Sequence, residues 1–444
     1  MKKTSVGLMC VLGVIVLTGI VSSSCNGRGG HEEAAFRQLA VEEYEDRVAG
    51  GWLGQAIGVL LGEPTEFKWI GRIIPFDLEN FCRLRPMPDE FVADGPGWEK
   101  QAEMIAYLQP YYDDMENFEK WTPDKMSDQD DLYVEFMFLH SIHERGPDVT
   151  ARGIAEDWLR YLAPNRVWGA NKQGYTNISN GIWPPDSGHP DNNIYPNAID
   201  FQIESDLFGL INPGMPVTSN AWCDKVGHMM NYGDGVYAGM AVAAMYGEAF
   251  FESDPRKLVE HSLEVIPAES NYAKMIRDVL RLRDEEPDWQ KAWHVLEEKW
   301  GRDDAGDPVM KLDVRINGAY VYMGLLYGDG DFWKSMNIAM RCGLDSDCNP
   351  STVGGILGTA LGMQGIPEKW AILRDLPIEN GSISEIYPPS ISWDDILRAT
   401  VEVGTRNVER HGGRIEDGVL LIPNQVPVVP PLEQTERRYD LVIR

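Results

Sequence analysis

The spacing of apolar residues constrains the fold of this chain more than any other feature of the sequence. Apolar residues recur three or four positions apart over most of its length, which places them on one face of an α-helix. The alternation that is typical of strands is scarce outside one short segment near the C-terminus. We therefore predict a compact, multi-helix, all-α fold with helices over residues 41–61, 130–144, 150–162, 234–250, 255–265, 271–285, 288–299, 316–327, 331–341, 351–363 and 393–410.

Two regions depart from this helical period. Residues 163–196 are rich in Pro, Asn, Gly and aromatic residues, and a long irregular loop inside a compact protein usually has a function. We predict that this loop folds over a site. Residues 413–444 read as a small hairpin followed by an extended, proline-rich tail, so one large domain is expected over residues 41–412.

Charge and composition restrict the class of partner. The chain has a net charge of −29 and no basic stripe, so it would repel the phosphates of nucleic acid. Its hydrophobic content of 43% is enough for a sizeable core, which excludes a disordered protein. We expect a small-molecule or glycan substrate and no nucleic-acid partner.

The N-terminus predicts export. Lys2 and Lys3 precede an apolar run over residues 6–21, which fits a signal peptide over residues 1–24. Cys25 follows three serines and precedes polar residues, as at a bacterial lipoprotein cleavage site, so we predict lipidation of Cys25 and a tether over residues 25–40. An ordinary signal peptide is the alternative. The expected location is the periplasm or cell surface, with a lipid anchor as the only membrane contact.

Three acidic clusters lie at the ends of predicted helices, at residues 63–66, 128–131 and 345–349. One interpretation is helix capping, because Asp side chains accept hydrogen bonds from the free N–H groups of a first turn. Another is that carboxylates from remote segments meet around a divalent cation, which prefers oxygen ligands. Unneutralised carboxylates at one place would repel each other and have raised pKa values. The residues alone leave both interpretations open.

The order of several motifs adds a resemblance. Residues 47–62 are followed by Pro64-Thr65-Glu66-Phe67, then Asp130-Asp131, then His228 with Gly233–Tyr237, and finally residues 345–349 with the sequence Asp-Ser-Asp-Cys-Asn. From about residue 47 to 370 this series resembles the ADP-ribosylglycohydrolase family, including its Thr-Asp-Asp-Thr and Asp-Thr-Asp-Thr-Asn motifs.

The resemblance implies an all-α catalytic domain with one or two magnesium ions, manganese being an alternative. It implies hydrolysis of an N- or O-glycosidic bond to a ribosyl-like sugar. Carried over by position, Asp130, Asp131, Asp345 and Asp347 are metal ligands. Glu66 is the carboxylate above the metals, which positions or protonates the reacting groups.

The chain departs from the family pattern at four positions. Gln129 stands where the family has Thr, although its amide oxygen can still be a ligand, and Leu132 replaces the next Thr and cannot. Cys348 replaces the last Thr with a soft ligand that suits magnesium poorly, and Val59 replaces an Asp. We count Gln129 and Cys348 among the candidate ligands. A one-metal site, another metal, or a relative that has lost activity are alternatives.

Four further residues are predicted to contact the substrate: Asn180 and Gly181 in the long loop, and His228 and Asp234 in the central motif. Turn geometry explains the first two equally well, and a lone His is often a hydrogen-bonded structural residue. The exported location leaves two alternative functions. One is a periplasmic glycoside or nucleoside hydrolase acting on a sugar other than ADP-ribose, and the other is a non-catalytic sugar-binding lipoprotein.

Overall fold

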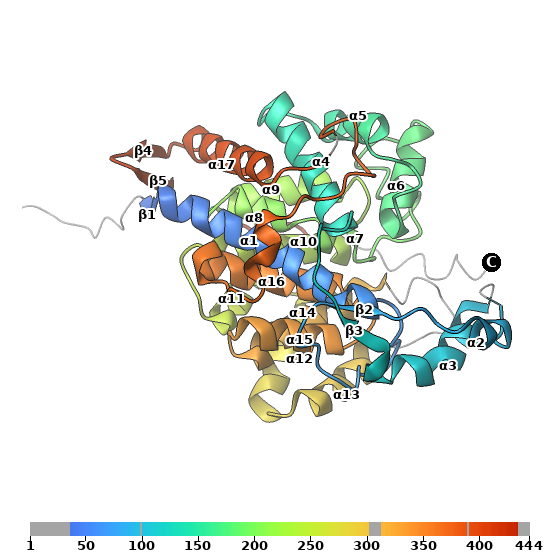
Figure 1. The fold of residues 1–444 in the computed structure, drawn as a ribbon. Coiled ribbons are helices and arrows are strands. Elements are labelled where there is room, and N and C mark those ends of the chain that lie inside the picture. The colour runs from blue at the N-terminus through green and yellow to red at the C-terminus, as the bar shows by residue number, and fades with distance from the viewer. Residues whose placement is uncertain (1–35, 98–99, 302–311, 389, 434–444) are drawn as a thin grey trace, which may run out of the picture. The chain divides into compact units, whose positions relative to one another are not determined.

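The computed structural model describes residues 36–97, 100–301, 312–388 and 390–433, and its helices confirm the all-α prediction (Figure 1). The predicted signal peptide and Cys25 lie outside these residues. The helices are α1 (Val41–Gly62), α2 (Asp89–Ala93), α3 (Gln101–Tyr112), α4 (Asp130–Arg145), α5 (Ala151–Tyr161), α6 (Gly169–Ser179), α7 (Asp200–Ile203), α8 (Asp206–Leu210), α9 (Pro216–Gly227), α10 (Asp234–Ala249), α11 (Pro255–Ser262), α12 (Asn271–Glu285), α13 (Trp289–Trp300), α14 (Val314–Gly328), α15 (Phe332–Arg341), α16 (Cys348–Leu361) and α17 (Trp393–Arg410).

The sheets within the described residues are small. Their strands are β1 (Phe36–Ala40), β2 (Cys82–Leu84), β3 (Phe118–Lys120), β4 (Arg414–Glu416) and β5 (Val419–Pro423). One antiparallel sheet has the order β1-β5-β4, with Phe36 opposite Pro423 and Arg414 opposite Leu421. The other pairs β2 with β3. The β4–β5 pair is the hairpin that the sequence predicts.

Helices α1 and α16 pack side by side at the centre of the fold (Figure 1). Glycines make this close approach possible: a Cβ on Gly54 would lie 2.0 Å from the carbonyl oxygen of Gly354, and one on Gly62 would lie 1.9 Å from that of Ser346. Helix α1 is buried on all sides from Val48 onward, as expected for a helix that is largely apolar all round rather than amphipathic. The packing holds the C-terminal end of α1 against the N-terminal end of α16.

The remaining helices surround this pair. Helix α14 packs on α15 and α16, α10 packs on α8, α9 and α16, and α4 contacts α1, α5 and α17. Leu132, in the first turn of α4, is buried in the core. The first turns of α4 and α16 are far apart in the sequence. Both nevertheless lie near the C-terminal end of α1, where Glu66 interacts with Asp130 and Asp347.

Each helix predicted from the sequence is present within a few residues of its expected bounds, but two irregular segments are shorter than predicted. Helix α6 forms within residues 163–196, whereas residues 180–199 are turns and bends. Residues 36–40, assigned to the tether, instead form β1, because their backbone pairs with β5. Helices α2, α3, α7, α8 and α9 were not predicted, although α3 buries Met104, Leu108 and Tyr112 at helical spacing.

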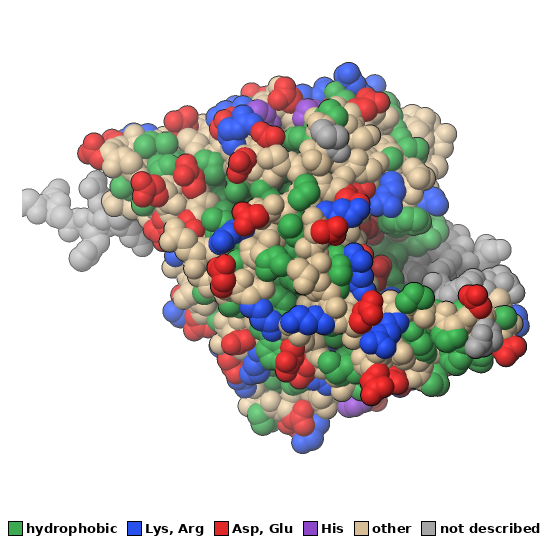
Figure 2. Space-filling model, in the orientation of Figure 1, with side chains coloured by type: hydrophobic (Ala, Val, Ile, Leu, Met, Phe, Trp, Pro, Cys, Tyr) green, Lys and Arg blue, Asp and Glu red, His purple; other side chains and the backbone are tan. Residues whose placement is uncertain are grey.

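Two features of the surface and helices bear on partners. On the face drawn in Figure 2, Lys and Arg side chains are interspersed with Asp and Glu side chains rather than gathered into a stripe. Among the described helices, none has the length and apolar character needed to cross a membrane.

Candidate functional site

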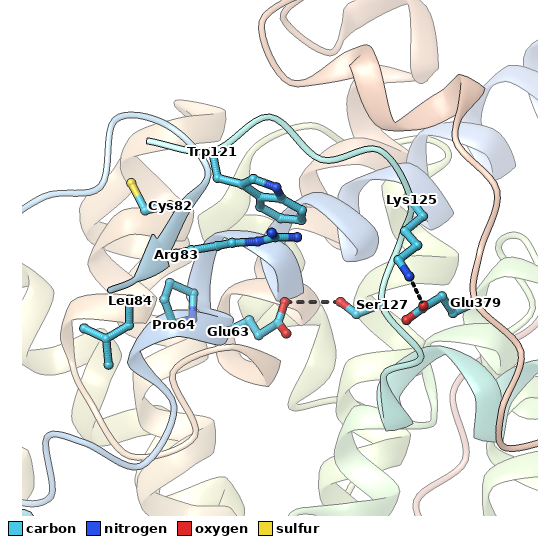
Figure 3. A pocket seen from close by; sticks show the side chains of 9 residues that line it. All are labelled: Glu63, Pro64, Cys82, Arg83, Leu84, Trp121, Lys125, Ser127 and Glu379. Atoms are coloured by element: carbon cyan, nitrogen blue, oxygen red, sulfur yellow. Dashed lines mark hydrogen bonds and ion pairs between the residues drawn. The ribbon is translucent and has the colours of Figure 1, made fainter. Parts of the chain in front are cut away.

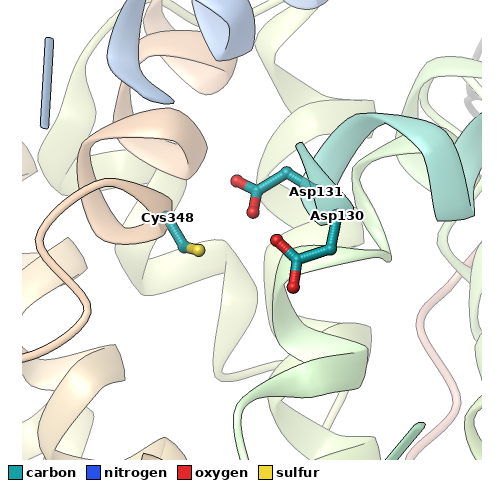
Figure 4. Close-up of side chains that lie close together, drawn as sticks. All are labelled: Asp130, Asp131 and Cys348. Atoms are coloured by element: carbon teal, nitrogen blue, oxygen red, sulfur yellow. The ribbon is translucent and has the colours of Figure 1, made fainter. Parts of the chain in front are cut away.

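Five carboxylates gather where α1, α4 and α16 meet, and we call them the acidic centre: Glu66, Asp130, Asp131, Asp345 and Asp347. Ligand atoms of Asp130, Asp131 and Cys348 all lie within 4.8 Å of one another (Figure 4). Asp345, Asp347 and Cys348 form a second group under the same limit. The structure thus brings the two aspartate pairs predicted as metal ligands to one place, with the Cys348 thiol common to both.

Three of the four aspartates of the acidic centre are buried, and two of them have a carboxylate oxygen without a partner. Asp131, Asp345 and Asp347 are 1%, 3% and 2% exposed. Asp131 Oδ1 and Asp347 Oδ1 have no hydrogen-bond partner among the described residues. A buried carboxylate oxygen without a donor or a cation is costly, so these atoms indicate a ligand that binds here.

Crowding and burial raise the pKa values of this cluster. The charge of Asp347, followed by burial, raises the pKa of Glu66 to about 9. Burial, followed by the charge of Asp130, raises the pKa of Asp131 to about 8. Burial raises the pKa values of Asp345 and Asp347 well above their ordinary value, and neighbouring carboxylates add to the effect. In the absence of a cation, part of the cluster is therefore protonated at neutral pH.

Helix capping does not explain Asp131, Asp345 or Asp347, although the Asp130 carboxylate accepts from backbone N–H groups at the start of α4. Helices α5 and α12 begin with Thr150 and Ser270, whose side chains accept from backbone N–H groups of the first turn. In contrast, α4 and α16 begin after Gln129 and Asp347, and neither of these side chains makes a cap hydrogen bond. Asn349 is buried inside the helix and donates from Nδ2 to Asn317 Oδ1 (3.0 Å).

The turn that precedes Glu66 is held against the segment before α16. This turn, η1 (Glu63–Thr65), follows α1 directly. The Thr65 hydroxyl donates to the carbonyl oxygen of Gly62 (2.7 Å) and lies 2.8 Å from Ser346 Oγ. The backbone N–H of Phe67 donates to the carbonyl oxygen of Leu344 (2.9 Å), with Phe67 at a positive φ of 51°. These contacts hold Glu66 beside the Asp345–Asp347 segment.

A pocket of about 410 Å³ opens beside the same turn (Figure 3). Glu63 Oε2 accepts from Ser127 Oγ (3.1 Å), and the Gln129 amide nitrogen lies 3.4 Å from the same Ser127 hydroxyl. The Arg83 guanidinium stacks on the Trp121 ring at 3.7 Å from its centroid. The lining residues are Glu63, Pro64, Cys82, Arg83, Leu84, Trp121, Lys125, Ser127 and Glu379.

A second pocket of about 690 Å³ shares Lys125 and Glu379 with the first. Lys125 is ion-paired with Glu379, and Arg166 is ion-paired with Asp128 at 3.2 Å. Asp128 lies two residues before Asp130, so the pair of pockets flanks the segment that leads into the acidic centre. The loop prediction missed this surface because most of its lining comes from outside residues 163–196.

The four residues predicted to contact the substrate lie elsewhere or have other partners. Asn180 and Gly181 are exposed at the C-terminal end of α6. His228 is buried, with Nδ1 2.6 Å from the carbonyl oxygen of Asp224 and Nε2 3.0 Å from Glu433 Oε1. Asp234 accepts from the backbone N–H of Tyr272 (3.0 Å).

A second group of buried acids, none of them among the predicted site residues, lies next to the acidic centre. Gln55 Nε2 donates to Glu135 Oε2 (3.2 Å) and to Asp206 Oδ2 (2.8 Å), and Tyr246 donates to the same Asp206 oxygen (2.5 Å). Burial raises the pKa of Asp206 to about 8 and that of Glu135 well above its ordinary value. Glu135 follows Asp131 by one helical turn, a spacing that could have revealed it.

Two further carboxylates from α7 and the residue after it belong to this acidic region. Burial raises the pKa of Asp200 to about 6 and that of Glu204 well above its ordinary value. The charge of Asp130 contributes to both shifts. Asn171 donates to both side chains, through its backbone N–H to Asp200 Oδ1 (2.9 Å) and through its amide to Glu204.

One comparison with known proteins identifies a family. The model of the ADP-ribosylglycohydrolase family matches residues 40–387, a range that includes the whole acidic centre. A solved structure described as an ADP-ribosylglycohydrolase-related protein complex is similar at 16% identity, with a TM-score of 0.46, over 82% of this chain and 98% of that chain. No curated protein matches the chain.

Proposed function

The chain belongs to the ADP-ribosylglycohydrolase family, and from that membership we propose that it is a metal-dependent hydrolase of an N- or O-glycosidic bond to a ribosyl-like sugar. Family membership supports the glycohydrolase class. The observation that carries the finer proposal is the convergence of two remote aspartate pairs with buried, unpartnered oxygens.

The residues of the acidic centre fit a divalent cation. Magnesium and manganese prefer oxygen ligands, and Asp131 Oδ1 and Asp347 Oδ1 are buried oxygens without a donor. Asp130, Asp131, Asp345 and Asp347 would hold the ion, and the Gln129 amide oxygen is a further candidate ligand. When bound, such an ion supplies Lewis acidity to oxygen atoms of the sugar and favours the ionised carboxylates.

Glu66 is the candidate proton donor of the chain itself. In the cation-free protein the charge of Asp347, followed by burial, raises the pKa of Glu66 to about 9. A cation bound to Asp347 would offset the first of these causes, whereas burial would still favour the protonated carboxyl group that a general acid needs. Lys68 Nζ lies 3.3 Å from the Glu66 carbonyl oxygen, and burial lowers the pKa of Lys68. Glu66 is half-buried and follows the turn whose Glu63 and Pro64 line the first pocket, so we assign the substrate entrance to this side of the acidic centre.

The substrate class is tested by release of free reducing sugar from ADP-ribosylated peptides, nucleosides and synthetic aryl ribosides. We expect one of these classes to be hydrolysed in the presence of magnesium or manganese, and chelator to stop the reaction. Sugar binding that persists in chelator, with no hydrolysis of any class, would instead support the non-catalytic sugar-binding alternative.

The location is a separate proposal that rests on the N-terminal sequence. A lipid on Cys25 would anchor the domain to a bacterial membrane and place the site in the periplasm or at the cell surface. Cys25→Ser should move the protein from the membrane fraction to the soluble fraction of the cell envelope. Unchanged partitioning of this variant would contradict the lipid anchor and leave the proposed chemistry untouched.

A further inference from the structure

The sulfur of Cys348 lies between the two aspartate pairs of the acidic centre. It belongs to the 4.8 Å group of Asp130 and Asp131 and also to that of Asp345 and Asp347. Figure 4 shows the Cys348 sulfur on the side of the residue that faces the α4 carboxylates. Among the described residues, Cys348 is the one candidate ligand that the two groups share, so a cation held by either pair lies next to its sulfur.

The Cys348 thiol is available as a ligand. Cys348 is 4% exposed and forms no disulfide. A second observation points to a ligand at the same place, because the Oδ1 atoms of Asp131 and Asp347 are buried without a partner. The Cys348 thiol hydrogen-bonds to the Asp131 side chain, so a cation bound at this group would replace the thiol proton in that contact.

The chemistry of this donor set differs from that of an all-oxygen site. Carboxylates accept both hard and borderline divalent ions, whereas a thiolate binds zinc and cobalt far better than magnesium. In the family pattern a threonine hydroxyl, which is a hard ligand, stands at the position of Cys348. Replacing that hydroxyl by a thiol keeps the size of the side chain nearly constant and changes the softness of the donor.

We propose that the acidic centre is a mixed carboxylate–thiolate site, in which Cys348 ligates a borderline transition ion of the zinc and cobalt class and shifts the preference of the site away from magnesium. The inference rests on the proposed function, because it requires that the acidic centre binds a divalent cation. When the ion binds, the S–H bond of Cys348 breaks, a sulfur–metal bond forms and the proton passes to solvent. The ion stays divalent and no electron is transferred.

Cobalt(II) is the probe that tests this ligand directly. The full chain, freed of metal by chelator, is titrated with cobalt(II) while near-ultraviolet absorption is recorded, because cobalt–thiolate bonds give a charge-transfer band in this region. We expect the band to grow until the site is full. In Cys348→Ser we expect the band to disappear and cobalt affinity, measured by calorimetry, to fall by at least about tenfold. Magnesium affinity should stay within about threefold or increase.

The matched control is Cys223→Ser, which alters another buried free cysteine, in α9, outside both metal-ligand groups. This variant should keep the band. Near-ultraviolet circular dichroism checks folding, and Cys348→Thr replaces Cys348→Ser if the serine variant does not fold.

Two outcomes overturn the proposal, and they separate it from the proposed function. Cobalt binding without a charge-transfer band, or a band that persists in Cys348→Ser, would show that the sulfur is not a ligand and would leave the metal centre intact. Absence of cobalt and magnesium binding to the wild-type chain would overturn both the thiolate ligand and the metal-dependent function.

Discussion

The acidic centre and the contact around His228 are both buried and both rich in ionisable groups, but their partners differ. In the second region, which we call the tail contact, Glu433 accepts from the backbone N–H of Gly233 (2.8 Å) and lies 3.0 Å from His228 Nε2. The Tyr237 hydroxyl donates to the carbonyl oxygen of Pro431 (3.0 Å) and lies 2.5 Å from the backbone nitrogen of Glu433. Every polar group named here has a protein partner.

The acidic centre shows the opposite pattern, since like charges meet and buried oxygens have no donor. The contrast teaches that proximity of ionisable side chains alone does not identify a functional site. A network whose members satisfy each other stabilises the fold, whereas a buried cluster that lacks counter-charge calls for a ligand from solution. The sequence predicts a functional role for residues in both regions, and variants in each region test these roles.

The largest expected difference between the two regions is in catalysis. Asp347→Asn should lower turnover by at least about a thousandfold, because it removes a charged candidate ligand from the acidic centre. Glu433→Gln, the matched carboxylate-to-amide change in the tail contact, should leave turnover within about twofold. Steady-state hydrolysis of the substrate found in the riboside screen measures both. Equal losses of turnover in the two variants would contradict a functional difference between the acidic centre and the tail contact.

A second effect separates proton transfer from cation binding inside the acidic centre. Glu66→Gln should lower the turnover number by about 10²–10⁴-fold, the usual contribution of a general acid. Its cation affinity should stay within about threefold, because Glu66 belongs to neither metal-ligand group. Turnover and calorimetric cation titration of the same preparation give the two numbers. If Glu66→Gln lost cation affinity but kept its turnover number at saturating cation, Glu66 would be a metal ligand rather than a proton donor.

The pH dependence of stability should expose the repulsion in the acidic centre. The pKa of Asp131 rises from its ordinary 3.8 to about 8 in the folded protein, so its protonated form favours folding. That contribution is complete below pH 3.8 and is lost as pH rises towards 8. The urea midpoint of the chelated protein should therefore fall between about pH 5 and pH 8, and magnesium or manganese should reduce this fall. If the urea midpoint falls equally with pH in the presence and absence of the ion, the cation site is contradicted.

The tail contact should give the smallest effect. Burial lowers the pKa of His228, but the hydrogen bond and charge of Glu433 outweigh burial and raise it. This contribution to stability is complete below the unfolded pKa of about 6.5 and is lost as pH rises through the folded pKa. His228→Gln should cost about 1–3 kcal/mol of unfolding free energy at pH 6, with unchanged turnover. Loss of turnover in a fully folded His228→Gln variant would support the predicted role of His228 in substrate binding.

The sequence predicted the parts of the fold that depend on local pattern. The segments that became α1, α4, α10 and α16 have strong apolar or small-residue patterns, and their motifs located the four aspartates of the acidic centre. Helix α6 was missed because its sequence, GANKQGYTNIS, has few apolar residues, and its buried face includes Asn171 and Asn177. A polar side chain buried by tertiary contacts leaves no apolar period to detect.

Hydrogen-bond partners that are far apart in the sequence could not be predicted from it either. Asp206 is 1% exposed and hydrogen-bonds to Gln55 and Tyr246, which are 151 and 40 residues away in the sequence. Glu433 lies in a tail whose sequence gives no sign that it reaches His228, 205 residues earlier. Such contacts depend on how the helices pack, and one sequence carries no direct record of that packing.

Calorimetric titration with magnesium, manganese and cobalt(II) tests the central claim most directly, using the full chain freed of metal by chelator. The matched sample is the Asp131→Ala, Asp347→Ala double variant, which removes two of the four aspartates and whose folding is checked by circular dichroism. The account predicts saturable binding to the wild-type chain and its loss in the double variant. Failure of the wild-type chain to bind magnesium, manganese or cobalt(II), or equal binding by both proteins, would contradict the acidic centre as the metal site.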